Sequence, residues 1–111
     1  MIEFSPHIAV DVQDREQAVA LYTAVLGMEV VDADPEEAVL RCGDITFYVQ
    51  EAATPQVYLD FATEDLETLV ASLRDSGCEL REIGGDDADT GYMVDDGNGL
   101  CFHLFEGPTE R

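Results

Sequence analysis

The stretch His7–Gly27, HIAVDVQDREQAVALYTAVLG, changes its hydrophobic period once, which predicts a strand leading directly into a helix. Apolar residues alternate within Ile8–Val12, as in a strand with one covered face. From Asp14 onwards they recur at helical spacing instead. Asp14 followed by Gln17 is typical of a capping box, and the closing glycine can take the left-handed conformation that ends a helix. We therefore expect His7 on the strand face that the helix leaves uncovered.

The same strand–helix pattern occurs again at 58–77, YLDFATEDLETLVASLRDSG. Aligning the two helix-starting residues, Asp14 and Asp65, gives an offset of 51 residues and places Tyr58 opposite His7. Each helix is followed by short strand-like runs with similar endings, FYVQE at 47–51 and FHLFE at 102–106. Repetition at about half the chain length predicts an internal duplication.

Each half is expected to contain a strand, a helix and three further strands. In the first half we expect strands at 7–12, 28–31, 38–42 and 45–51 and a helix at 14–26; in the second, strands at 57–62, 78–83, 91–94 and 100–106 and a helix at 65–76. The predicted fold is α+β, with two βαβββ modules, residues 1–52 and 57–107, in one domain of 111 residues. One helix covers only one face of a four-stranded sheet, so pairing two modules would form a curved mixed sheet around a cleft, with the helices outside.

The composition is that of a globular protein, with 46% hydrophobic residues. No apolar run approaches the roughly 20 residues of a membrane span, and Met1–Phe4 does not resemble the start of a secretory signal. We therefore expect a cytoplasmic protein without a membrane partner. Three cysteines, none in a Cys-x-x-Cys pair, predict neither a disulfide framework nor a zinc knuckle.

The charge is unusual, because 25 acidic residues against five arginines, with no lysine, give −20 at pH 7. A phosphate backbone would be repelled, so nucleic acid is not expected as a partner. One interpretation is a solvated acidic surface, since the acids cluster at 32–37, 64–67 and 86–89 in expected loops and helix ends, including an acidic loop at 84–89. The other is a field that attracts a cationic ligand into a cleft.

The sequence resembles the vicinal oxygen chelate superfamily, which includes glyoxalase I, bleomycin-resistance proteins, extradiol dioxygenases and methylmalonyl-CoA epimerase. The resemblance covers nearly the whole chain. It lies in HIAVDVQD at 7–14, the helix end with Leu21-Tyr22 and Leu26-Gly27, the helix start Asp65-Leu66, and DGNG at 96–99 before the last strand. Gly97 stands where that family commonly has proline. The resemblance implies the paired-module fold described above.

Metal-dependent members of that superfamily hold a divalent ion with one His, Gln or Glu from the first and last strands of both modules. At the matching positions this chain has His7, Tyr48, Tyr58 and His103, with Cys101 in place of His103 in an alternative register. Neutral phenols, with a pKa of about 10, are poor substitutes for carboxylate ligands. We therefore expect no catalytic residue and no cofactor, with Zn, Ni, Mn or Fe held by His7 and His103 as the alternative.

The expected ligand-binding residues are aromatic or polar and point to the uncovered face: His7, Asp11, Tyr48, Tyr58, Tyr92, His103 and Phe105. Phe47, Phe61 and Phe102 should instead lie in the core under the helices. Aromatic walls with a few polar groups suit a planar organic ligand, and Asp11 would suit a cationic one. Either histidine could instead be a structural residue bonded to the backbone.

Three functions fit these residues. The first is a binding protein of the bleomycin-resistance type, which sequesters or carries an aromatic compound, cationic or neutral, without chemistry and so could confer antibiotic resistance. The second is a metal-dependent lyase, isomerase or dioxygenase of the same superfamily. The third is a structural subunit without a ligand. A chain this short leaves its cleft open unless two chains pair, so we expect a homodimer.

The charge generates a prediction about stability. Because like charges repel in the compact state and salt screens that repulsion, the melting temperature should rise by several degrees between low and molar NaCl. Differential scanning calorimetry measures this directly. A melting temperature independent of salt would show that self-repulsion does not limit the stability of the fold.

Overall fold

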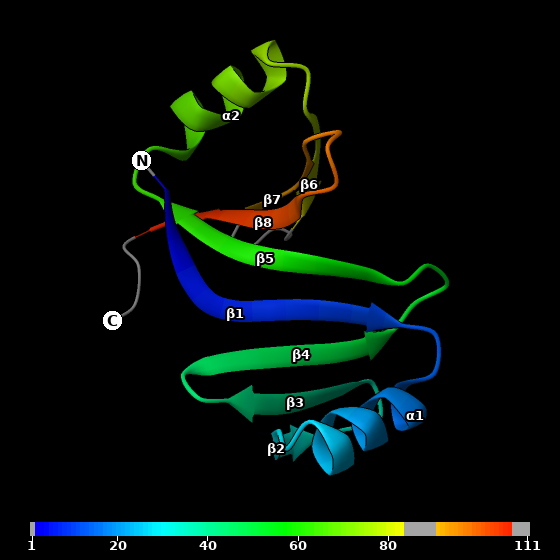
Figure 1. The fold of residues 1–111 in the computed structure, drawn as a ribbon. Coiled ribbons are helices and arrows are strands. Elements are labelled where there is room, and N and C mark those ends of the chain that lie inside the picture. Colours follow the sequence, from blue (N-terminus) through cyan, green and yellow to red (C-terminus); the bar gives the residue numbers. More distant parts are fainter. Residues whose placement is uncertain (1, 84–90, 108–111) are drawn as a thin grey trace. The chain divides into compact units, whose positions relative to one another are not determined.

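In each half of the chain, the first strand pairs in parallel with the last strand of the same half (Figure 1). In the computed structural model, β1 (Ile2–Val12) lies beside β4 (Ile45–Glu51), and β5 (Gln56–Thr63) lies beside β8 (Cys101–Glu106). The other strands add in antiparallel order: β3 (Glu37–Cys42) and β2 (Glu29–Ala33) in the first half, β7 (Gly91–Asp95) and β6 (Glu79–Ile83) in the second. The strand orders are β2-β3-β4-β1 and β6-β7-β8-β5, so both halves have the predicted βαβββ arrangement.

The structure describes residues 2–83 and 91–107, and the acidic loop expected at 84–89 lies outside them. The chain divides into two compact units, residues 6–57 and residues 58 onwards, the latter joined by the first five residues. We call these the first and the second unit. No helix in the described part of the chain is long and apolar enough to cross a membrane.

A side-chain cap begins the helix of each unit. The Asp14 carboxylate accepts a hydrogen bond from the Gln17 amide at 3.1 Å, and the Asp65 carboxylate accepts one from the Thr68 amide at 3.2 Å. The helices that follow are α1 (Arg15–Ala20) and α2 (Leu66–Asp75). Both helix starts are therefore explained by the same short motif, as the repeat predicted.

The two helices differ in one respect, because α1 continues as a π-helix, η1 (Leu21–Val25). The helix starts are offset by 51 residues, but the glycines that end the helices, Gly27 (φ 82°) and Gly77 (φ 92°), are offset by only 50. The first helix thus contains one extra residue. A π-turn accommodates such an insertion without moving the helix ends.

Each unit has its own core between its helix and one face of its sheet. In the second unit, Leu66 and Val70 of α2 pack with Val94, Phe102 and Leu104 of the sheet. In the first unit, the buried residues Ala38, Leu40 and Val49 pack against partly buried residues that include Ala18, Val19 and Tyr22. Phe47, Phe61 and Phe102 lie in these two clusters, so their prediction as core residues is confirmed.

The start of the chain differs from the prediction. The first strand was expected at 7–12, but β1 begins at Ile2 and includes Pro6. Phe4 packs edge to face against Phe61, with 6.1 Å between the ring centroids. Phe4 and Phe61 both belong to the second unit, and this contact links residues 57 positions apart, which a local pattern does not reveal.

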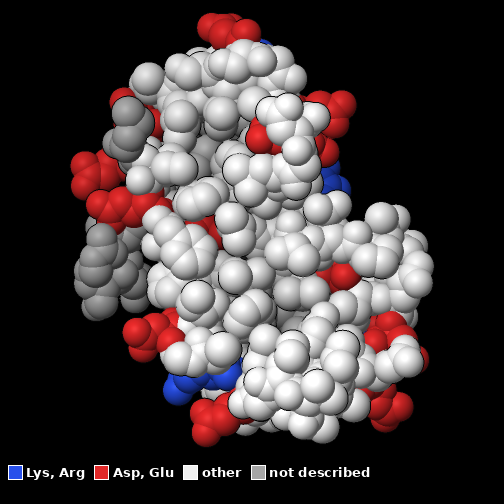
Figure 2. Space-filling view, in the orientation of Figure 1, with Lys and Arg blue, Asp and Glu red and all other residues white. Residues whose placement is uncertain are grey.

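The described acidic residues lie mostly on the surface. Asp32, Asp34, Glu36, Glu64 and Glu67 are all exposed. On the face shown in Figure 2, Asp and Glu lie in separate groups with wide uncharged areas between them. The backbone amides of Glu36 and Glu37 donate to the Asp34 carboxylate and lower its pKa.

The core predicts a large cost for one truncation. Leu104 is 0% exposed, so Leu104→Ala should lower the free energy of unfolding by about 2–5 kcal/mol through lost burial and the cavity that remains. Leu100→Ala, at a leucine that is 41% exposed, is the matched control and should cost roughly 0.5 kcal/mol or less. Urea unfolding of both variants checks the difference; equal losses would contradict the assignment of Leu104 to the core.

Candidate functional site

Alternation along the paired strands decides which side chains lie on the face away from the helix. In the first unit, β1 and β4 pair so that His7 lies opposite Thr46, Ala9 opposite Tyr48, and Asp11 opposite Gln50. The intervening residues include Val10 and Val49, which pack in the core under α1. We call the sheet faces turned away from the helices the open faces of the two units. Three predicted site residues, His7, Asp11 and Tyr48, share the open face of the first unit.

Each of these three side chains contacts another residue of the same open face. The imidazole of His7 packs edge to face against the phenol ring of Tyr48, with 5.7 Å between the centroids. The amide nitrogen of Gln50 donates a hydrogen bond to Asp11 Oδ1 at 3.0 Å. The Asp11 carboxylate is half-buried, and Gln50 keeps it in one orientation.

The open face of the second unit carries a tighter aromatic cluster. The rings of Tyr58 and His103 are stacked, with 5.1 Å between centroids and 10° between planes. The Phe105 ring packs edge to face against His103, with 6.0 Å between the ring centroids. All three side chains are half-buried. We call Tyr58, His103 and Phe105 the aromatic cluster.

A glycine on the neighbouring strand makes room for this cluster. Gly91 of β7 pairs with Phe105 of β8, and a Cβ atom at Gly91 would lie 2.5 Å from the Phe105 ring. No side chain can therefore occupy this position while Phe105 keeps its place. The ring lies over the glycine backbone, which fills the gap that a missing side chain leaves in a sheet.

Sequence reasoning missed Asp60, which is the direct neighbour of His103 in the parallel pairing of β5 and β8. Its Oδ1 atom is shielded from solvent. Met93 lies on the other side of His103, and beyond it the Arg81 guanidinium is 2.6 Å from the Met93 sulfur. Because Asp60 follows Tyr58 by two residues, the strand period already placed it on the same face.

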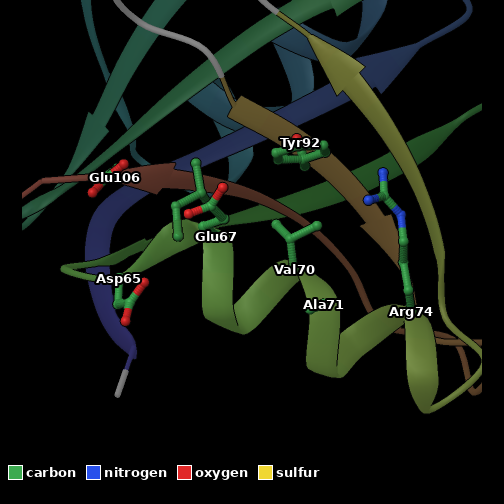
Figure 3. Close-up of a pocket in the computed structure, with 8 residues that line it drawn as sticks. Asp65, Glu67, Val70, Ala71, Arg74, Tyr92 and Glu106 are labelled. Carbon is green, nitrogen blue, oxygen red and sulfur yellow. The ribbon is translucent and has the colours of Figure 1, made fainter.

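Tyr92 was expected on the open face with the other predicted ligand-binding residues, but it lies on the covered face of its strand. It pairs with Leu104, not with His103, and packs against the core cluster under α2. There it lines a hollow of about 620 Å³ with Asp65, Leu66, Glu67, Val70, Ala71, Arg74 and Glu106 (Figure 3). The Arg74 guanidinium lies 5.8 Å from the centroid of the Tyr92 ring. Val94 lies two residues after Tyr92 on the same face of β7, and its apolar side chain indicates that this face is covered.

A tight turn leads into the strand that carries His103. Asp96 Oδ1 accepts hydrogen bonds from the amides of Asn98 at 2.7 Å and Leu100 at 3.1 Å. The bond from Asn98 is the main reason that the pKa of Asp96 lies below its ordinary value. Partial burial, with the Asp95 and Asp96 carboxylates nearby, raises the pKa of the Cys101 thiol. Cys101 is therefore harder to ionise to the thiolate that a metal would require.

The described residues do not fit a metal centre within either unit. Nowhere among residues 2–83 and 91–107 do three His, Cys, Asp or Glu side chains come together in a way that could hold an ion. The rings of Tyr48, Tyr58 and Phe105 contact the two histidines. Hard divalent ions prefer anionic oxygens, which these rings do not supply.

Comparison with solved structures supports the fold. A glyoxalase/bleomycin resistance/dioxygenase superfamily member from Vibrio splendidus is similar at 17% identity and a TM-score of 0.69, over 96% of this chain and 100% of that one. Methylmalonyl-CoA epimerase from Mycobacterium tuberculosis is similar at 19% identity and a TM-score of 0.60, over 92% and 86%. A variant of homoprotocatechuate 2,3-dioxygenase from B. fuscum is similar at 19% identity and a TM-score of 0.71, over 97% of this chain but 33% of that longer one.

The sequence itself matches one family. No curated protein matches the chain. The family described as Glyoxalase-like domain matches residues 7–105, which include His7, Asp11, Tyr48, Tyr58, Asp60, His103 and Phe105. This α+β protein of two βαβββ modules is therefore a member of the glyoxalase-like family.

Proposed function

We propose that this chain is a small-molecule-binding member of the glyoxalase-like family that sequesters or carries a planar aromatic compound. The observation that carries the proposal is the aromatic cluster on the open face of the second unit, where Tyr58 stacks on His103 beside Phe105. Stacked and edge-on rings give flat, apolar surfaces to which another flat ring adds with little loss of conformational entropy. The imidazole and phenol groups supply the few polar atoms that orient such a ligand.

The charges favour a cationic member of this class. Each open face carries one half-buried aspartate, Asp11 in the first unit and Asp60 in the second. A net charge of −20 raises the local concentration of cations and lowers that of anions. A cation also gains energy over an aromatic ring. The ligand class we propose is therefore a planar aromatic compound with a positively charged group.

A binding experiment tests this function. Pairs of cationic and neutral planar aromatic compounds are screened by thermal shift, and Kd values of the hits are measured by calorimetry. Tyr58→Leu should weaken binding about tenfold, because ring stacking contributes about 0.5–1.5 kcal/mol beyond buried area. Asp60→Asn should weaken only the cationic member of each pair.

Tyr92→Leu is the matched control, since Tyr92 lies on the covered face of the same sheet. This variant should bind like the wild type once its own stability has been measured. If no compound raises the melting temperature, the binding function is wrong. If Tyr58→Leu binds as tightly as the wild type, the aromatic cluster is not the site.

A metal-dependent lyase, isomerase or dioxygenase activity is the second candidate. It is favoured by the structural similarity to methylmalonyl-CoA epimerase and by His7, which matches a metal-ligand position in the superfamily resemblance. The measurement that separates the candidates is the metal content of protein purified without a histidine tag. We expect much less than one equivalent of Zn, Ni, Mn or Fe per chain. Near one equivalent, lost in His7→Ala, would replace the binding function with the metal-dependent one.

A further inference from the structure

We propose that the hollow beside α2 is a second binding site, which takes a small zwitterion of the size of a tripeptide. We call it the α2 hollow. All its lining residues belong to the second unit, and it lies on the helix side of the sheet, whereas the aromatic cluster lies on the open face. Its volume of about 620 Å³ is typical of small-molecule sites. The proposal is independent of the ligand-binding function proposed above.

The middle of the α2 hollow is apolar. Leu66 and Val70 are 8% and 5% exposed and belong to the core cluster of the second unit. The half-buried ring of Tyr92 packs against the same cluster, and in Figure 3 it lies across the hollow from Val70. An apolar group in the middle of a ligand would therefore be covered by helix and strand side chains, which favours its binding.

The charged groups that line the hollow lie at its two ends. Glu67 belongs to the first turn of α2 and Glu106 ends β8, whereas Arg74 belongs to the last turn of α2. Figure 3 shows both glutamates near the start of the helix and the Arg74 guanidinium near its end. Arg74 follows Glu67 by seven residues, which is a rise of about 10 Å along a helix. This arrangement matches a ligand with an ammonium group at one end and a carboxylate at the other.

Helix stability accounts for only part of this arrangement. An acidic residue in the first turn and a basic residue in the last turn stabilise any helix. Glu106 and Tyr92 belong to strands and contribute nothing to that effect. The Arg74 guanidinium lies 5.8 Å from the centroid of the Tyr92 ring, and this contact holds the cation at the wall of the hollow. Arg74 is therefore placed to meet an anionic group of a ligand.

The first unit has a corresponding but smaller hollow of about 400 Å³. Its helix residues Asp14, Glu16 and Val19 stand where the α2 hollow has Asp65, Glu67 and Val70, at the same offset of 51. Ala38 of β3 stands where β7 has Tyr92, since the two pair with the corresponding residues Val49 and Leu104. The second unit therefore has an aromatic wall where the first has only a methyl group.

The two hollows also differ in the partner of the glutamate that ends the last strand. In the first unit Arg15 lines the hollow, and its amide donates to the Glu51 carboxylate at 3.0 Å. The second unit has the buried Leu66 at the position of Arg15. Within residues 2–83 and 91–107, the carboxylate of Glu106, the counterpart of Glu51, has no hydrogen-bond or ion-pair partner. The second unit thus leaves to a ligand the positive group that Arg15 brings to the first.

Titration of the untagged full chain with the tripeptide alanyl-leucyl-alanine tests the proposal. Three extended residues span about 10–11 Å, so the two termini can reach the two charged ends of the hollow. We expect binding in the millimolar range or tighter, with shifts of the Val70 and Ala71 methyl resonances in NMR spectra. Acetylation of the amino terminus and amidation of the carboxyl terminus should each weaken binding about fivefold, which is the effect of one partly exposed ion pair.

Substitutions identify which end of the peptide each charge binds. Arg74→Gln should weaken binding of the free tripeptide about fivefold but leave the amidated tripeptide unaffected, because only the free form has a carboxylate. Glu67→Gln and Glu106→Gln should each weaken binding of the free tripeptide but not of the acetylated one. A general loss of structure would instead weaken binding of all three forms equally.

Matched controls remove the same charges elsewhere. Arg81 is exposed on β6 outside the hollow, and Glu16 is the residue of the first unit that corresponds to Glu67. Arg81→Gln and Glu16→Gln should bind the tripeptide like the wild type. The proposal is overturned if no saturable binding occurs up to about 10 mM tripeptide. It is also overturned if Arg74→Gln weakens the free and amidated forms equally, or if Glu16→Gln weakens binding as much as Glu67→Gln does.

Discussion

The parallel pairing of the first and last strands within each half is the constraint on which the remaining structure depends. It joins residues about 40 positions apart and sets their register, His7 with Thr46 and Asp60 with His103. Once the register is set, the two-residue period of a strand assigns every side chain of β1, β4, β5 and β8 to the covered or the open face. A shift by one residue would bury His103 and expose Leu104, which costs hydrophobic burial and desolvates an imidazole. Burial of the apolar side chains on the covered face therefore fixes the strand register, and the register fixes which side chains lie on the open face.

Within this shared frame the two halves have diverged. The first has an extra helical residue taken up as a π-helix and the exposed Leu21 and Leu26. The second has Ser72 and Ser76 at the corresponding positions and the stacked pair Tyr58–His103. The first residue of each helix also differs. In the first unit it is Arg15, whose amide donates to the Glu51 carboxylate and whose guanidinium donates to the Asp34 carbonyl. In the second unit the corresponding residue is the buried Leu66. The two halves therefore share one backbone arrangement and differ in the side chains on their surfaces.

Much of the fold was predictable, because the hydrophobic period changes where strands become helices and because the pattern occurs twice. The π-helix was not predicted, although the offsets of 51 at Asp14 and 50 at Gly27 contain the extra residue. The early start of β1 was not predicted, and Phe4 in this segment contacts Phe61, which is distant in sequence. At the site, the alternation of apolar and polar residues predicted which side chains of β1, β4 and β8 lie on the open face. Tyr92 was predicted on the wrong face of β7, although the apolar Val94, two residues further on, indicates that this face is covered. Asp60 was overlooked although it follows Tyr58 by one strand period.

The most direct test of this account is the NMR spectrum of the aromatic side chains during titration with a planar cationic compound selected by thermal shift. The account predicts that the ring resonances of Tyr58, His103 and Phe105 shift as the complex forms. Those of Tyr92, which lies under α2, should stay unchanged. Shifts confined to Tyr92 and the residues that line the hollow beside α2 would contradict the account, because they would place the ligand on the covered side of the sheet.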